Sequence, residues 1–376
     1  MTESKKTSAL AVKYVAFVVS GDHECAMAVR AREMASRLRA DYEIQIVYRR
    51  RQKLFSILTT LIALRDIRPA ITYVFDISYS AVLGAAIYRF IFRNRLIIET
   101  GDAITELVRS TGSRRRPGVW LTGVLEKFAM RFADRVVVRG SFHKKWLSQQ
   151  GIDADVIPDG VDTCLFRPHD GRQLRCRYGL DGMLTIGMIG SSVWSEKLQM
   201  SYGWDLVEAL RLLKHQPVKG VMIGDGSGIP HLKALCRQYG IDEKLLFLGH
   251  VPYEQLADYL SLIDICLSTQ TNDVVGQVRT TGKLPLYLAS GRYVLASKVG
   301  EAAIVLDQDM LVDYHGVKDV DYPRRLSERI ESILQKPEVL ARGLGNQSLA
   351  KEFFDYEVLA KRLGAVIAAT LKPANS

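Results

Sequence analysis

The residues best suited to chemistry are glycines, hydroxyls and cations that follow short apolar runs. The GDGSG stretch (224–228) ends one such run and opens a helical pattern, so its glycines let a ligand approach the backbone closely. Arg279 and Lys283 are four residues apart, and a helix would place both on one face. Two cations at a helix N-terminus suit a diphosphate. The pattern therefore predicts an anion site, with a solvated first turn as the alternative.

Polar residues also follow two runs nearer the start of the chain. Gly21-Asp22-His23-Glu24 comes directly after the first run, and Asp102 follows the fourth. Either group suits contact with a substrate, and Asp102 could orient a hydroxyl. Both stretches are equally compatible with ordinary strand-to-helix turns in which the aspartate caps the helix.

Two basic runs, Arg49–Lys53 and Arg114–Arg116, precede helical patterns. The helix after the first has an apolar face with Leu54, Ile57, Leu58 and Leu61. Such helices can dock on an anionic membrane, and the alternative is a solvated basic face over an ordinary core stripe. The sequence contains no recognisable nucleic-acid module, and we predict no nucleic-acid partner.

The elements that position these residues alternate between short β-branched runs and helical patterns. Runs without strict alternation of apolar and polar residues are typical of strands buried on both faces, so we expect parallel sheets covered by helices. Leu121, Leu125, Phe128 and Phe132 form the stripe of one helix. The predicted strands are 14–20, 42–48, 70–76, 95–100, 135–140 and 154–158, then 184–190, 220–224, 245–249, 265–269 and 293–297.

Both halves repeat the same alternation, which predicts an α/β fold with two Rossmann-like domains facing across a cleft. Ligands of such sheets bind beyond the carboxyl ends of the strands. We predict an N-terminal domain over 1–168 and a C-terminal domain over 169–355, with the polar stretch 169–183 as linker. Residues 356–376 are predicted to form a helix that packs back towards the N-terminal domain.

Composition limits the class of protein. The 376 residues are 48% hydrophobic and 24% charged, which is usual for a globular protein and excludes a disordered or fibrous one. A net charge of +10 favours anionic partners. Five scattered cysteines predict reduced thiols, and no apolar stretch reaches the length of about 18 residues that suggests a membrane span. Lys13 interrupts the apolar start of the chain, so we read it as a strand, not a signal peptide, and expect a cytoplasmic protein.

Five stretches, taken in order, carry a family resemblance. The inter-domain VIPDGVDTCLFRP is the most specific of them. Together they resemble the GT-B glycosyltransferases that use nucleotide-sugar donors with retention, family four or glycosyl transferases group 1. The stretches are ADRVVVRGSFHKKWL (133–147), VIPDGVDTCLFRP (156–168), GDGSG (224–228), LFLGHVP (246–252) and GKLPLYLASGRYVLAS (282–297).

The resemblance implies that the C-terminal domain binds the nucleotide-sugar and the N-terminal domain the acceptor. It also implies that the leaving diphosphate itself helps deprotonate the acceptor hydroxyl, and that no metal and no cofactor are required. We expect Asp102 and His23 to act in catalysis, and Gly21, Asp22 and Glu24 to contact the acceptor. The expected donor-binding residues are Gly190, Ser191, Ser192, Lys197, Gly224, Asp225, Gly226, His250, Val251, Arg279 and Lys283.

The chain departs from the family pattern in several places. The two glutamates that the family usually has eight residues apart are Val278 and Leu286 here, so a carboxylate for the donor ribose is missing. The histidine common after the fourth strand is Gly101.

The Arg and Lys that often clasp the diphosphate are also replaced. Ser191 and Tyr202 occupy their places, and Lys197, in a longer loop, is the expected substitute.

The function predicted from the resemblance is transfer of a sugar to a hydroxyl of a small molecule, a glycan or a lipid-linked acceptor. One alternative is a degenerate, non-catalytic member that binds a nucleotide or a partner. Another is a GT-B enzyme with a non-sugar, pseudoglycosyl donor. Contact with an anionic membrane would place the protein at the inner face of that membrane.

Overall fold

The structure is a computed structural model that describes residues 14–49 and 55–372, and its contacts divide the chain into two compact units. The first unit comprises the chain up to Thr100, Leu125–Val137 and the chain from Ala360 onward. The second comprises Gly101–Val124 and Val138–Leu359. The domain limits expected from the sequence, 1–168 and 169–355, remain a prediction.

The first sheet has six strands in the order β2-β1-β3-β4-β5-β6. Strands β1 and β2, β1 and β3, and β3 and β4 pair in parallel. All residues of β3 are buried, as expected for a strand covered on both faces. Each strand lies within a predicted run: β1 (Tyr14–Val19), β2 (Glu43–Tyr48), β3 (Ile71–Phe75), β4 (Arg95–Thr100), β5 (Arg135–Val138) and β6 (Asp155–Val156).

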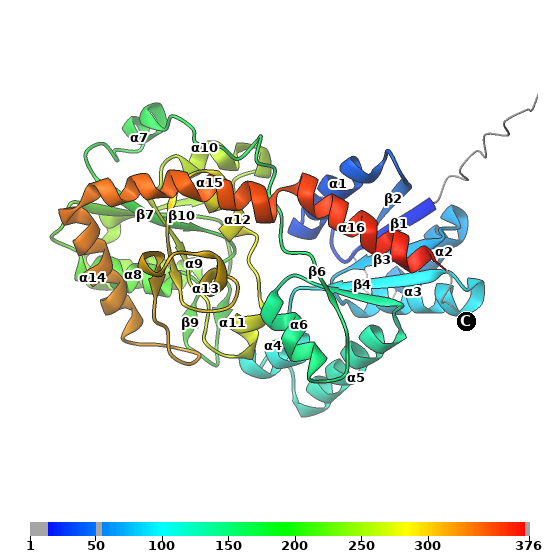
Figure 1. Cartoon of the computed structure of the whole chain (residues 1–376). Helices are drawn as coiled ribbons and strands as arrows, with labels where there is room; N and C mark the ends of the chain where they lie inside the picture. Colours follow the sequence, from blue (N-terminus) through cyan, green and yellow to red (C-terminus); the bar gives the residue numbers. More distant parts are fainter. Residues whose placement is uncertain (1–13, 50–54, 373–376) are drawn as a thin grey trace, which may run out of the picture. The chain divides into compact units, whose positions relative to one another are not determined.

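The helices of the N-terminal half follow these strands (Figure 1). They are α1 (Ala26–Leu38), α2 (Phe55–Ile67), α3 (Tyr79–Phe92), α4 (Ile104–Thr111), α5 (Arg116–Phe132) and α6 (Ser141–Ser148), and the chain's last described helix is α16 (Tyr356–Leu371). In the core of the first unit, Arg30 Nε lies 2.9 Å from Glu99 Oε1, and the Tyr73 hydroxyl donates to Glu99 Oε2 at 2.6 Å. This buried pair joins α1 to β4.

The second sheet has the order β11-β10-β7-β12-β13-β14, and its pairs are parallel. Its strands are β7 (Leu184–Ile189), β10 (Val218–Ile223), β11 (Leu245–Gly249), β12 (Ile265–Ser268), β13 (Tyr293–Ser297) and β14 (Leu311–Val312). The predicted fold class, with two parallel sheets, is confirmed. Sequence reasoning missed β14 and a small antiparallel hairpin, β8 (Trp194–Ser195) with β9 (Met200–Ser201).

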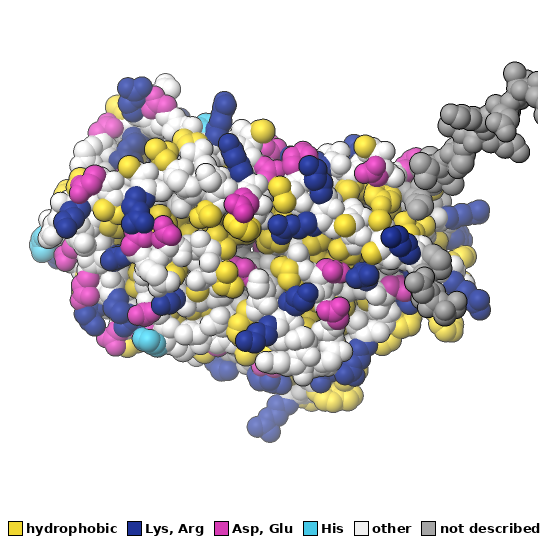
Figure 2. Space-filling model, viewed as in Figure 1, with side chains coloured by type: hydrophobic (Ala, Val, Ile, Leu, Met, Phe, Trp, Pro, Cys, Tyr) yellow, Lys and Arg dark blue, Asp and Glu magenta, His cyan; other side chains and the backbone are white. Residues whose placement is uncertain are grey.

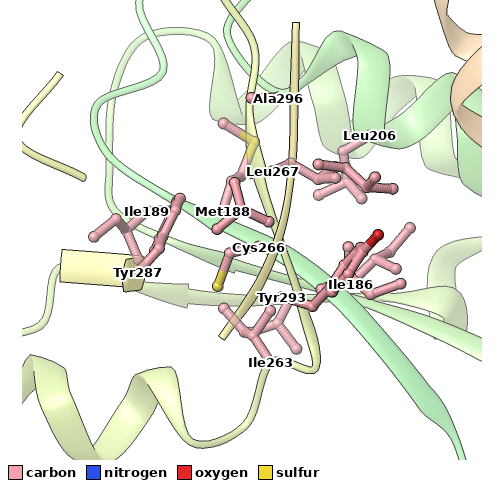
Figure 3. Close-up of a cluster of buried hydrophobic side chains, with 14 of the residues drawn as sticks. Ile186, Met188, Ile189, Leu206, Ile263, Cys266, Leu267, Tyr287, Tyr293 and Ala296 are labelled. Carbon is pink, nitrogen blue, oxygen red and sulfur yellow. The ribbon is translucent and has the colours of Figure 1, made fainter. Parts of the chain in front are cut away.

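Helices alternate with the strands of the C-terminal half as well. They are α7 (Arg172–Arg177), α8 (Trp204–Leu212), α9 (Ile229–Tyr239), α10 (Leu256–Leu260), α11 (Val274–Val278), α12 (Lys283–Ala289), α13 (Ala302–Val305), α14 (Tyr322–Gln335) and α15 (Asn346–Leu349). Side chains from β7, β12, β13 and α12 meet in one core cluster, part of which is drawn in Figure 3.

Several helices turn apolar residues outward, among them α2, α3 and α5. The predicted stripe on α5 is not a core stripe, because Leu121 and Phe128 are exposed while Thr122 and Glu126 are buried. On α2, Leu61 packs against the core but Leu58 is exposed. The basic residues Arg50–Lys53 and Leu54 lie outside the described residues.

Within the described residues, no helix is long and apolar enough to cross a membrane. The same residues contain no group of three or more His, Cys, Asp or Glu side chains placed to hold a metal ion.

Candidate functional site

The loops that follow β7 and β10 pack backbone to backbone. The Ser192 amide donates to Asp225 O at 2.9 Å, and the Gly228 amide donates to Ser192 O at 2.8 Å. Gly224 and Gly226 have φ values of +131° and +148°, and a Cβ on either would lie 2.2 Å or 2.0 Å from a carbonyl oxygen of the facing loop. These glycines are therefore required for contact between the two loops. From the sequence alone, we expected them to let a ligand approach the backbone.

Lys283 lies beside these loops, against an aromatic ring. Its Nζ is 3.7 Å from the centre of the Tyr202 ring, and a Cβ on Gly190 would lie 4.0 Å from the same ring. The Ser192 hydroxyl donates to Tyr202 O at 2.7 Å. The loop after β7, Tyr202 and Lys283 thus form one cluster, which we call the Lys283 cluster.

A buried hydrogen bond positions Lys283 relative to that loop. Tyr287 is one helical turn beyond Lys283 on α12, and its hydroxyl accepts from the Ile189 amide at 2.8 Å. Figure 3 shows Tyr287 beside Ile189 in the core. Since Ile189 ends β7, this contact fixes α12 against the start of the loop.

Lys283 has no carboxylate partner among the residues that the structure describes. Burial lowers the pKa of its ammonium from 10.5 to about 7. A partly dehydrated cation that faces only the negative face of a ring is a strong binding group for an incoming anion.

Arg279 does not share a helix with Lys283, so the predicted cradle of two cations on one helical face is wrong. Residues 279–282 are not helical, because α11 ends at Val278 and α12 begins at Lys283. Arg279 Nε instead lies 2.7 Å from Asp102 Oδ1. Burial favours a higher pKa for Asp102, but its pairing with Arg279, helped by Arg139, outweighs burial and lowers that pKa.

Sequence reasoning missed a set of charged residues around Asp102. Arg139 pairs with Asp159 at 3.4 Å, and Asp159 also accepts from the Thr280 hydroxyl at 2.9 Å. Burial lowers the pKa of His143 to about 4, so its imidazole is neutral near pH 7. Arg139 directly follows β5, and its position at the carboxyl end of a strand was the available signal.

A narrow pocket adjoins this set. Ser141 donates its amide hydrogen to Glu301, whose carboxylate lies at the rim. The pocket has a free volume of ≈ 20 Å³, room for about one water. Its lining includes Asp159, Gln270, Arg279, Thr280, Glu301 and Phe354.

Most of the other expected donor-binding residues lie on or next to the loops after β7 and β10, but Lys197 does not. His250 and Val251 follow Gly249, whose carbonyl accepts from the Gly224 amide at 2.7 Å. Asp225 and Ser191 are exposed on the same loops. Lys197 lies between β8 and β9 and donates to Arg109 O at 3.1 Å, so its ammonium already has a partner on α4.

Val278 and Leu286 stand where the resembled family has its glutamates. Both side chains are buried and apolar. They contribute to packing, and neither provides a polar contact to a ligand.

The residues expected to meet the acceptor lie after β1 in the first unit. Asp22 accepts from the Glu24 amide at 3.2 Å, which makes a local turn before α1. His23 and Glu24 are exposed, 3.7 Å apart. A Cβ on Gly21 would lie 2.5 Å from the Cys25 sulfur, so a side chain at position 21 would require the Cys25 side chain to shift.

Comparison with known families adds the decisive observation. Residues 185–336, which include Tyr202, Lys283 and both loops, match the family described as Glycosyl transferases group 1. This part of the chain is similar to the glycosyl transferases group 1 family. The predicted resemblance is thereby confirmed, and low identities to curated relatives make the matched part a divergent one.

Curated relatives match only in part. The D-inositol 3-phosphate glycosyltransferase of Segniliparus rotundus is 28% identical over 230 residues, 58% of this chain and 47% of that protein. The GPI3 subunit of phosphatidylinositol N-acetylglucosaminyltransferase of Saccharomyces cerevisiae is 22% identical over 258 residues, 67% of this chain and 54% of that protein. The chain thus spans about half the length of the curated relatives it matches.

Solved structures match almost the whole chain. The Anabaena protein HepE in complex with UDP-glucose has a TM-score of 0.75 at 16% identity, with 95% of this chain and 99% of that one covered. Sucrose-phosphate synthase from Thermosynechococcus elongatus has a TM-score of 0.74 at 16% identity, with 95% and 98% covered. These likenesses show the GT-B fold.

Proposed function

We propose that the protein transfers a sugar from a nucleotide-sugar donor to an acceptor hydroxyl. The single observation that carries this proposal is the Lys283 cluster, in which an ammonium without a carboxylate partner lies against Tyr202 beside the loop after β7. The family of residues 185–336 and the UDP-glucose bound by HepE support a nucleotide-sugar as the ligand. UDP is the first nucleotide to test.

In the proposed reaction, the bond between the anomeric carbon and the diphosphate breaks and a bond from that carbon to the acceptor oxygen forms. The acceptor proton passes to the departing phosphate. Lys283 stabilises the charge that develops on this leaving group, while Asp102 and His23 act on the acceptor side. Retention at the anomeric carbon, and transfer without metal or cofactor, are parts of the proposal.

The acceptor is proposed to be a small molecule, a glycan or a lipid-linked hydroxyl compound. The net charge of +10 suits an anionic acceptor or an anionic membrane. We propose that the protein works in the cytoplasm, in peripheral contact with the inner face of the membrane.

One observation favours a second function. Val278 and Leu286 leave the family's two carboxylates without substitutes, and Asp102 is already paired with Arg279. A protein that binds a nucleotide or a partner without turnover would have this arrangement.

Thermal unfolding with UDP, GDP, ADP, dTDP and CDP tests the nucleotide site first. A nucleotide at about a hundredfold excess over its Kd stabilises the folded state by about 2.7 kcal/mol. We expect a shift with UDP that Lys283→Met abolishes and that Lys298→Met, which changes an exposed lysine, retains.

Transfer or hydrolysis of UDP-sugars then separates the two functions. Release of UDP from a UDP-sugar supports the transferase. Nucleotide binding without release from any sugar donor supports the non-catalytic protein, and no shift with any of the five nucleotides overturns the site.

A further inference from the structure

Helix α5 (Arg116–Phe132) exposes four large apolar residues, although Ala129 and Met130 near its end are buried. Trp120, Leu121, Val124 and Phe128 are 70%, 49%, 43% and 40% exposed, and their spacing places them on one side of the helix. Thr122 and Glu126, which point inward, are 1% and 5% exposed. A surface helix normally buries its apolar stripe. We call the four exposed residues the outward face of α5.

The exposed charges of α5 itself and of the loop directly before it are all positive. The only acidic residue between Ser113 and Phe132 is Glu126, which is buried. The exposed cations in the same span are Arg114, Arg115, Arg116, Lys127 and Arg131. In Figure 2, the lower edge of the molecule, where Figure 1 draws α5, shows hydrophobic side chains with Lys and Arg beside them.

Helices α2 and α3 also expose apolar residues. On α3 these are Ile87, Phe90, Ile91 and Phe92, and the Arg89 guanidinium within that helix is paired with Asp134. On α2, Phe55, Leu58 and Ile62 are exposed, but an exposed Arg65–Asp66 pair follows them. Within the described residues, α3 has one exposed cation, Arg93, at its end, whereas five exposed cations lie on α5 or directly before it. The density of positive charge therefore distinguishes α5.

We propose that the outward face of α5 docks on an anionic lipid surface. An apolar stripe with an aromatic residue, bordered by cations, lies in the plane of the lipid headgroups and gains both apolar burial and attraction to anionic lipid. A single helix that presents its ridge outward needs no groove in its partner, which suits a fluid surface. The proposal rests on the membrane contact proposed above and does not depend on glycosyl transfer.

Flotation of the full-length chain with vesicles tests the docking. We expect binding to vesicles of phosphatidylcholine with phosphatidylglycerol, and weak binding to phosphatidylcholine alone. Raising the salt from about 0.05 M to about 0.3 M should weaken binding at least about tenfold, because exposed charges are screened. Equal binding to both vesicle types, or none to either, overturns the proposal.

Two double variants locate the surface. Trp120→Ser with Leu121→Ser should weaken vesicle binding at least about tenfold through lost apolar burial. Val320→Ser with Leu344→Ser removes exposed apolar side chains elsewhere and should leave binding unchanged. The UDP-induced thermal shift, if present, should be the same in both variants, so failure of the docking and failure of the nucleotide site are distinguishable.

Tryptophan fluorescence reports contact at α5 directly. Transfer of Trp120 from water to the lipid interface should shift emission to shorter wavelength, and Trp120→Phe should remove most of this shift while the protein still binds. A full shift in Trp120→Phe places the contact elsewhere and overturns the assignment. A change of molecular mass in the lipid-free Trp120→Ser, Leu121→Ser protein, with vesicle binding unchanged, would instead make this face an interface between copies.

Discussion

At the scale of single residues, Lys283 combines burial, an aromatic neighbour and the lack of an acidic partner within the described residues. Burial that lowers its pKa to about 7 makes its charge depend on pH in the range where cells work. An anionic ligand reverses this effect, because a nearby negative charge favours the protonated form. Ligand binding and proton binding at Lys283 are therefore linked.

The affinity for UDP should depend on pH through this linkage. In the free protein Lys283 loses its proton as the pH rises through about 7, whereas the bound diphosphate raises its pKa. Binding above that pH therefore takes up a proton, and affinity should fall by up to about tenfold per pH unit. Calorimetric titrations at several pH values, in buffers of different ionisation enthalpy, measure both effects. A pH-independent affinity that persists in wild type and Lys283→Met alike contradicts the assignment.

Lys283 should lower the free energy of unfolding when no ligand is bound. Its folded pKa, about 7, lies below the ordinary value of 10.5, so below pH 7 the folded state carries the full cost of burying the charge. Between these values the unfolded chain binds more protons, and stability rises with pH. Lys283→Met should therefore stabilise the protein at pH 6 by roughly 1 to 3 kcal/mol, with partial exposure reducing the effect.

Urea unfolding at pH 6 and pH 9 measures this difference. The gain from Lys283→Met should be smaller at the higher pH. A variant that is less stable than wild type at pH 6 would show that the methylene chain and the Tyr202 contact matter more than the charge.

At the scale of elements, the two loops after β7 and β10 depend on each other's shape. Gly226→Ala places a Cβ 2.0 Å from Ser192 O at a φ of +148°, so both the clash and the backbone conformation oppose it. We expect a loss of about 2 to 4 kcal/mol and weaker nucleotide binding. Gly345→Ala, where nothing lies within 4 Å, is the control and should cost nothing or stabilise slightly.

Chemical denaturation of both variants, followed by UDP titration, measures the two effects. If Gly226→Ala unfolds at the same urea concentration as wild type, the loop–loop contact is not a structural requirement.

The order of elements was predictable because buried strands and amphipathic helices have distinct periods. Helix α16 begins at the predicted residue, Tyr356. The β8–β9 hairpin was missed because each of its strands has two residues, too few for any period to register.

Side-chain partners were less predictable than elements. Arg279 and Lys283 are four residues apart, but the three residues between them are not helical. Their spacing therefore does not place the two side chains on one face of a helix. Asp102 and Arg139 follow the ends of β4 and β5, and His143 lies on α6. These residues are close together only because the three elements meet in the folded chain. Such meetings depend on tertiary structure, which a single sequence does not reveal. The stripe on α5 had helical period, but period alone does not tell which side faces the core.

At the scale of the whole molecule, each unit has its own core, and the residues proposed to bind the donor belong to the second. Glu99→Gln in the first unit leaves Arg30 without its buried ion pair and should destabilise the protein by about 2 to 4 kcal/mol. Because the Lys283 cluster lies in the other unit, UDP affinity should stay unchanged.

Glu33→Gln is the matched control. It breaks the less buried pair between Glu33 and Arg37 on α1 and should cost less than about 1 kcal/mol. Thermal unfolding and UDP titration of both variants measure these effects. Equal losses of stability in the two variants would mean that burial of the Arg30–Glu99 pair is unimportant.

The Arg139 guanidinium occupies the space in which any side chain at position 101 would begin, with a Cβ there only 2.3 Å from it. The residue type tolerated at position 101 therefore depends on the residue at position 139. A side chain at position 101 requires the Arg139 guanidinium to leave its place beside Asp159, so its cost falls when Arg139 is replaced by a shorter residue. Homologues with a side chain at the place of Gly101 should therefore more often have a short residue at the place of Arg139.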